Sequence, residues 1–169
     1  LTPRNSPDYT LGVGGTLLRR KAEGASIAWL IVTTISKESG WSSEKVKQRA
    51  DEIKRISLLY DFDEVYALNF PTTKLDTIPM SDIVASVSGA FKSFKPDEIF
   101  VPHPSDVHSD HRVVFNAVSA CTKWFRYPSV KRVLAYETLS ETDFGLCTDQ
   151  TFHPNVFVDV TEFFGKKIK

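Results

Sequence analysis

The sequence has few cysteines, no long apolar run and no excess of charge of either sign. Its 169 residues include two cysteines, Cys121 and Cys147, too few for a disulfide framework or a four-thiolate zinc site. The longest apolar runs, such as residues 27–32, are far shorter than the roughly 20 residues that a membrane-spanning helix requires. Lysine and arginine together number 21, as do aspartate and glutamate. We therefore expect neither a membrane span nor a nucleic-acid partner.

Signals for export and for nucleotide binding are also missing. No basic segment followed by an apolar segment opens the chain, and the sequence therefore predicts a cytoplasmic protein. A G-x-G-x-x-G fingerprint that started at Gly12 would need glycine at the position of Leu17, and no G-K-[ST] or G-x-S-x-G motif occurs. These absences weigh against a nucleotide-binding α/β module.

What remains is an ordinary globular composition, with 41% hydrophobic and 25% charged residues. A chain of this length fits one domain, so we expect residues 1–169 to form a single domain. Residues 163–169 look like a helix that has only begun, which predicts a domain cut short at its C-terminus. The sequence leaves open whether the protein forms a homo-oligomer.

Apolar stretches alternate between strand-like and helix-like spacing. Residues 25–34 form a near-continuous apolar run, typical of a strand buried on both faces. Shorter runs of this kind are residues 65–68, 98–101, 133–136 and 156–160. Stripes at helical spacing lie between them: Val46, Ala50, Ile53 and Ile56; Ile83, Val87, Ala90 and Phe94; Val113, Val114, Ala117, Val118 and Cys121. This alternation predicts an α/β fold, a Rossmann-like three-layer sandwich with a mainly parallel sheet.

Three of the four histidines fall within nine residues, directly after a predicted strand. Residues 101–111 read Val-Pro-His-Pro-Ser-Asp-Val-His-Ser-Asp-His, and α/β proteins place their sites at such strand-to-helix loops. His108 and His111 are three residues apart, so both rings project from one helical face. Asp106 and Asp110 are close enough to orient the imidazoles, as carboxylates do around zinc. The alternative is an exposed polar helix start, with Asp106 or Ser109 as its cap.

A second candidate segment lies near the N-terminus. Residues 8–18 read Asp-Tyr-Thr-Leu-Gly-Val-Gly-Gly-Thr-Leu-Leu, and such small residues let the backbone approach a ligand or a neighbouring strand. Tight packing of a helix against a strand explains the glycines about as well. Asp8 and the histidine cluster could meet at one sheet edge, where oxygen and nitrogen ligands suit a catalytic zinc. Zinc would lower the pKa of a bound water toward about 7 and polarise a carbonyl.

These segments resemble two motifs of the LmbE/PIG-L family of zinc-dependent de-N-acetylases. The tail of the family's first motif, H-P-D-D-E-x-L-G-x-G-G-T, matches residues 11–16, and its later motif, D-x-H-x-D-H, matches residues 106–111 at every fixed position. Residues 49–52 resemble a family R-x-x-E helix. The resemblance spans nearly the whole chain. It implies removal of the acetyl group from an N-acetylated amino sugar or its conjugate, of the N-acetylglucosaminyl type.

The resemblance also implies roles for individual residues. His111 matches the family's metal histidine and Asp8 its metal aspartate, so we expect zinc on these two residues. His108 matches the histidine that stabilises the charge on the attacked carbonyl oxygen. Asp110 matches the acid that holds this histidine in its working state, and Arg49 matches an arginine that faces the substrate.

The head of the first motif departs from the family pattern. An alignment without a gap places Asn5 at the metal histidine and Pro7 at the general base, with Asp8 at the metal aspartate. With one inserted residue, Arg4 stands at the histidine, and a third register makes Asp8 the base. The first histidine is absent in all three registers, and Asp8 is one acid where the family uses two.

Two hypotheses from different classes follow. The first is a zinc-dependent hydrolase that acts on a small N-acetyl sugar or glycoconjugate. The second is a family member that binds a sugar without turnover, because the first metal histidine and the second acid are missing. Loss of the general base would slow the attack of water by roughly 10²- to 10⁴-fold. The sequence leaves open whether Asp106 or Asp110 substitutes as the base.

Overall fold

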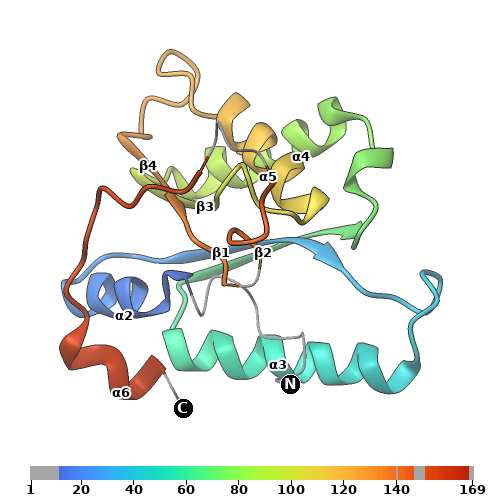
Figure 1. The fold of residues 1–169 in the computed structure, drawn as a ribbon, viewed down its shortest axis with the longest axis horizontal. Helices are drawn as coiled ribbons and strands as arrows, with labels where there is room; N and C mark the ends of the chain where they lie inside the picture. Colours follow the sequence, from blue (N-terminus) through green and yellow to red (C-terminus); the bar gives the residue numbers. More distant parts are fainter. Residues whose placement is uncertain (1–11, 140, 147–150, 168–169) are drawn as a thin grey trace.

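The computed structural model describes residues 12–139, 141–146 and 151–167 of the chain. Parallel strands form its middle layer: β1 (Ala28–Thr34), β2 (Glu64–Pro71), β3 (Glu98–Pro102) and β4 (Arg132–Tyr136). Helices α2 (Gly14–Ala22) and α3 (Ser43–Tyr60) lie on one side of the strands, and α4 (Met80–Phe94) and α5 (Ser109–Ala120) on the other (Figure 1). Short helical turns complete it: η1 (Leu75–Thr77), η3 (Thr161–Phe163) and α6 (Phe164–Lys167). The predicted α/β sandwich is confirmed.

The strands pair two by two. Strand β1 pairs with β2, with Ile31 opposite Ala67, and β3 pairs with β4, with Phe100 opposite Leu134. Both pairs are parallel, as strands joined by crossover helices should be. Within the described residues the two pairs stay separate, and no backbone ladder joins them.

Local signals fix where the elements begin and end. Helix α3 starts at Ser42, whose hydroxyl accepts the Lys45 N–H at 3.2 Å, and ends at Asp61 in the left-handed region (φ 50°). Strand β1 begins three residues later than predicted. The preceding turn at Gly24 (φ 88°) is held by the Ala25 N–H, which donates to the carbonyl of helix α2 at Arg20.

The principal core lies between β3 and the helices α4 and α5. Its buried members are Leu75, Ile83, Val87, Phe91, Ile99, Val101, Ala117, Val118, Cys121 and Tyr127. Burying each large apolar side chain stabilises the fold by about 1.5–3 kcal/mol. The stripes predicted for α4 and α5 therefore face the core. In the stripe predicted for α3, Ala50 is exposed. The buried residue of this helix is Tyr60, which lies outside that stripe.

The prediction of a strand at residues 156–160 is wrong. This segment has no strand partner among the described residues, and the side chains of Val156 and Phe157 are 50% and 81% exposed. Its apolar residues mimic a strand in sequence, but a strand needs a neighbour to satisfy its backbone. The predicted C-terminal helix does begin, at Phe164. No described helix is both long and apolar enough to cross a membrane.

Candidate functional site

The segment after β3 turns into α5 through hydrogen bonds made by its own histidines. His108 is the N-cap of α5, and its Nδ1 accepts the backbone N–H of Asp110 at 3.2 Å. Because Nδ1 is the acceptor, the proton of a neutral His108 ring sits on Nε2. The alternative interpretation of this segment made Asp106 or Ser109 the cap, and the structure gives this role to His108.

His111 is oriented by a buried carboxylate. Its Nδ1 lies 2.8 Å from Oδ2 of Asp106, whose side chain is completely buried. An ionised carboxylate only accepts hydrogen bonds, so Nδ1 donates and Nε2 carries the lone pair that a metal ion takes. The rings of His108 and His111 stack with their centroids 4.9 Å apart. The structure therefore brings both predicted histidines together, as the spacing implied.

A buried threonine pair completes the surroundings of Asp106. Thr142 donates its hydroxyl to Asp106 Oδ1 at 2.5 Å and accepts the backbone N–H of Thr138 at 2.8 Å. Both threonines are buried. These hydrogen bonds hold the Asp106 carboxylate in place, and that carboxylate in turn orients His111. Sequence reasoning missed them, because Thr142 lies 36 positions from Asp106 and no motif includes it.

Asp110 holds the connection between β2 and α4. Its carboxylate accepts the Thr73 N–H at 2.6 Å and the Leu75 N–H at 3.2 Å, and Asp110 is 4% exposed. Thr73 has a φ of 60°, a left-handed conformation that is unusual for a β-branched residue. Asp110 thus ties this connection to the first turn of α5, beside His108. Asp110 contacts His108 through its backbone N–H, which donates to the histidine Nδ1.

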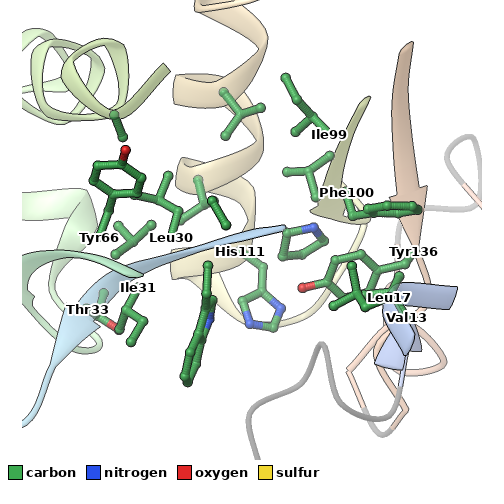
Figure 2. Close-up of a pocket in the computed structure, with 18 of the residues that line it drawn as sticks. Val13, Leu17, Leu30, Ile31, Thr33, Tyr66, Ile99, Phe100, His111 and Tyr136 are labelled. Atoms are coloured by element: carbon green, nitrogen blue, oxygen red, sulfur yellow. The ribbon is translucent and has the colours of Figure 1, made fainter. Parts of the chain in front are cut away.

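His108, Asp110 and His111 line one large cavity with a volume of about 1990 Å³. Figure 2 shows His111 between the strand residues Leu30 and Ile31 on one side and Phe100 on the other. Arg49 of α3 also lines this cavity, half-buried, with its guanidinium 3.8 Å from the Glu52 carboxylate. The arginine singled out from the sequence therefore faces the same space as the histidines.

The other two histidines differ in environment. His103 bonds locally, with Nδ1 2.6 Å from the Ser105 hydroxyl and its ring edge-on to Phe152. Burial lowers the pKa of His103, although Asp106 opposes the shift. These contacts hold the His103 ring within its own turn and against Phe152. His153 is exposed.

Gly14 and Gly15 lie where helix α2 packs closely against its neighbours. A Cβ on Gly14 would collide with the hydroxyl of the buried Tyr60, and one on Gly15 would lie 2.9 Å from Val160. Glycine therefore lets α2 approach α3 and the C-terminal segment. The packing interpretation expected a strand as the neighbour, and these two glycines instead pack against a helix and the C-terminal segment.

Asp8, predicted to bind zinc, lies outside the described residues, as do Arg4, Asn5 and Pro7. Within the described ranges, no cluster of three or more histidine, cysteine or acidic side chains is arranged to hold a metal. His111 is a described residue whose donor chemistry fits zinc. A neutral imidazole with a carboxylate behind it is the usual form of a zinc-binding histidine.

Proteins of known family and structure resemble this chain over most of its length. The family model described as PIG-L, GlcNAc-PI de-N-acetylase, matches residues 7–122. A conserved protein from Thermus thermophilus superposes with a TM-score of 0.71 at 26% identity, over 95% of this chain and 71% of its own. N,N'-diacetylchitobiose deacetylase from Pyrococcus horikoshii, solved with an inhibitor, superposes with a TM-score of 0.70 at 20% identity, over 95% and 63%. No curated protein sequence matches the chain.

Proposed function

The chain belongs to the PIG-L family of GlcNAc-PI de-N-acetylases, and on that premise we propose that it is a zinc-dependent hydrolase that deacetylates an N-acetylated amino sugar or its conjugate. The family membership supports a deacetylase-type function. The dependence on zinc and the identity of the substrate as an N-acetyl sugar are parts of our proposal. The observation that supports the proposal is the 2.8 Å contact between Asp106 and Nδ1 of His111, a histidine at the start of α5 that lines the large cavity.

In this proposal Asp8 and His111 hold the zinc. The chemistry that a zinc ion held there would supply is polarisation of the acetyl carbonyl and a lower pKa of a bound water. Asp106 keeps His111 in the tautomer with its lone pair on Nε2. The donor set is one carboxylate and one imidazole, both of the kind that zinc uses at catalytic sites.

His108 is placed to stabilise the developing oxyanion. Its Nδ1 is occupied by the backbone N–H of Asp110, so its proton is on Nε2, the nitrogen that remains for the substrate. A hydrogen-bond donor aimed at the carbonyl oxygen becomes more effective as that oxygen gains negative charge. Asp110 fixes the first turn of α5 and with it the direction of this ring.

The general base is a separate question, because Asp106 and Asp110 both have their carboxylate oxygens engaged. Asp106 bonds to His111 and Thr142, and Asp110 bonds to two backbone N–H groups. A base must reach the water that it deprotonates. These contacts argue against both residues, and because this proposal places Asp8 on the zinc, it assigns no described residue as the base.

Arg49 would bind the sugar. It lies on α3, across the cavity from the start of α5, and a guanidinium donates several hydrogen bonds in a fixed fork. Hydroxyl and carbonyl oxygens of an N-acetyl sugar are suitable acceptors. Substitution of Arg49 should therefore raise the KM for the sugar more than it lowers kcat.

A second candidate function is sugar binding without turnover. The departure of the first motif favours it, because Asn5 or Arg4 stands where the family has a metal histidine. The cavity and Arg49 would remain as a sugar site, and hydrolysis would be absent.

The test is the release of amine from N-acetylglucosamine and N,N'-diacetylchitobiose by the 169-residue chain, with zinc added or removed by a chelator. We expect turnover that the chelator abolishes and zinc restores. His111→Ala should abolish it, whereas His153→Ala, a change at an exposed histidine, should leave it intact. Saturable sugar binding without turnover, with zinc present, would select the second function instead.

A further inference from the structure

The connection between α5 and β4 (Figure 1) presents two aromatic side chains to solvent. Trp124 is 80% exposed and Phe125 is 60% exposed, and their rings meet edge to face with centroids 5.8 Å apart. A single exposed apolar side chain is ordinary, whereas two large rings in contact form a continuous apolar surface. We call residues 123–126, which carry these rings, the aromatic turn.

Hydrogen bonds and the core hold the aromatic turn in place. The Lys123 carbonyl accepts the backbone N–H groups of Arg126 and Tyr127, both at 2.9 Å. Tyr127 is buried in the principal core and donates its hydroxyl to Ser88 at 2.8 Å. The exposed rings therefore sit on a backbone that is already ordered, which lowers the entropy cost of binding a partner.

Basic residues surround the two rings, although the whole chain has no net charge. Residues 121–132 include four basic residues and no acidic one. The last of the four, Arg132, pairs with Glu98. Lys123 and Arg126 flank the rings directly, and both are exposed. This local excess of positive charge favours an anionic partner.

Helix α4 adds another cation beside the turn. Lys92 of α4 and Arg126 of the turn line one groove, with a volume of about 550 Å³. Lys92 is exposed as well. Cations from two separate elements therefore face the same side of the molecule as the aromatic rings.

A second copy of the chain is a less suitable partner for this surface. Two aromatic side chains bury about 150–250 Å² each, roughly half of the 800 Å² per partner that a stable interface needs. In a symmetric contact, Lys123 and Arg126 would face the same two cations of the other copy and repel them.

A single-stranded nucleic acid also fits less well. Its bases stack on open aromatic faces that follow one another along a groove. The rings of Trp124 and Phe125 are nearly perpendicular, at 85°, and the Arg126 guanidinium lies over the Phe125 ring, 5.7 Å from its centroid. The turn therefore offers no pair of parallel faces to successive bases.

We propose that the aromatic turn binds the surface of a membrane that contains anionic lipids. Tryptophan and phenylalanine side chains enter the boundary between headgroups and acyl chains. Each lysine or arginine near an anionic surface strengthens binding about fivefold. Such binding is peripheral and needs no spanning helix. It goes beyond deacetylation and does not depend on it.

The aromatic turn is separate from the candidate site. Helix α5 has 12 residues and is therefore about 18 Å long. The turn follows its C-terminal end, whereas His108 and His111 lie at its N-terminal end. Variants of the turn should therefore change membrane binding and leave the chemistry of the site unchanged.

The experiment is cosedimentation of the 169-residue protein with vesicles of phosphatidylcholine, either alone or with about one third phosphatidylserine. We expect binding to be at least about tenfold stronger with phosphatidylserine in about 0.1 M salt. This preference should disappear in about 1 M salt, where the Debye length falls to about 3 Å. Tryptophan emission should shift to shorter wavelength on binding, and Trp124→Phe should remove the shift.

Serine substitutions test the apolar part of the surface. Trp124→Ser combined with Phe125→Ser should weaken binding to phosphatidylserine vesicles at least about tenfold. Leu58→Ser is the matched control, because Leu58 is 82% exposed on α3. It should leave binding within about twofold.

Glutamine substitutions test the charged part. Lys123→Gln combined with Arg126→Gln should weaken binding to phosphatidylserine vesicles about 25-fold. Lys47→Gln combined with Lys54→Gln removes the same charge from exposed positions of α3 and should leave binding within about twofold.

Several results would overturn the proposal. These are no binding to phosphatidylserine vesicles at low salt, equal binding to both kinds of vesicle, and unchanged binding by the double serine variant. A dimer that the double serine variant converts to a monomer would assign the turn to a second copy of the chain. Tighter binding to single-stranded DNA than to vesicles would assign it to a nucleic acid.

Discussion

Replacing Thr142 by valine should destabilise the protein, because it breaks the buried series of hydrogen bonds that orients His111. Valine keeps the shape of threonine and removes the hydroxyl. Asp106 Oδ1 then loses a 2.5 Å donor and the Thr138 N–H loses a 2.8 Å acceptor. Asp106 is completely buried and Thr142 is 8% exposed, so water cannot easily replace either bond.

The magnitude follows from the two losses. A hydrogen bond to a charged group contributes about 1.5–3 kcal/mol, and a buried polar group left without a partner costs about 1–3 kcal/mol. We expect a loss of about 3 kcal/mol in the free energy of unfolding. For a domain of this size that lowers Tm by roughly 6–12 °C. Thr142→Ser keeps the hydroxyl, removes one methyl group and should cost only about 0.8 kcal/mol.

The assay is urea and thermal unfolding of the parent and both variants, followed by circular dichroism. Zinc titration of the same proteins adds a functional readout, because loss of a group that supports a metal-binding histidine typically weakens metal affinity about 10- to 100-fold. Equal stability of the valine and serine variants would refute the reasoning. It would mean that the Thr142 hydroxyl supports neither Asp106 nor His111.

Three further predictions concern stability. Asp110→Asn leaves only one acceptor for two backbone N–H groups and should cost about 2 kcal/mol in urea unfolding. Gly14→Ala meets a buried tyrosine hydroxyl and should cost about 1–3 kcal/mol, whereas Gly89→Ala in α4 meets nothing within 4 Å and should stabilise by about 0.5–1 kcal/mol. The pKa of Asp63 is lowered, first by the Ile27 N–H, so this stabilisation is present above about pH 4 and is lost as the pH falls. Asp63→Asn should flatten that part of the stability–pH profile.

The sequence predicted the elements whose apolar spacing is strong. Residues 98–101 and the stripe that begins at Ile83 became β3 and α4, because periodic burial is a local property of the chain. The prediction of a strand at residues 156–160 was wrong because strand formation is not a local property. Whether an apolar run forms a strand depends on a neighbouring strand, and no local pattern reports that neighbour.

In the candidate site, too, local features could be predicted from the sequence and distant contacts could not. The spacing of His108 and His111 correctly placed both rings together, because three residues bring side chains to one helical face. Thr142 and the backbone partners of Asp110 could not be predicted, since they lie more than 30 positions away in sequence.

The most direct test of the account is the zinc content of the 169-residue protein, purified without chelators, measured for the parent, His111→Ala and His153→Ala. The account predicts about one zinc per chain in the parent and in His153→Ala, and loss of zinc in His111→Ala. No zinc in the parent after incubation with excess metal, or full zinc retention by His111→Ala, would contradict the central claim that His111 holds the metal.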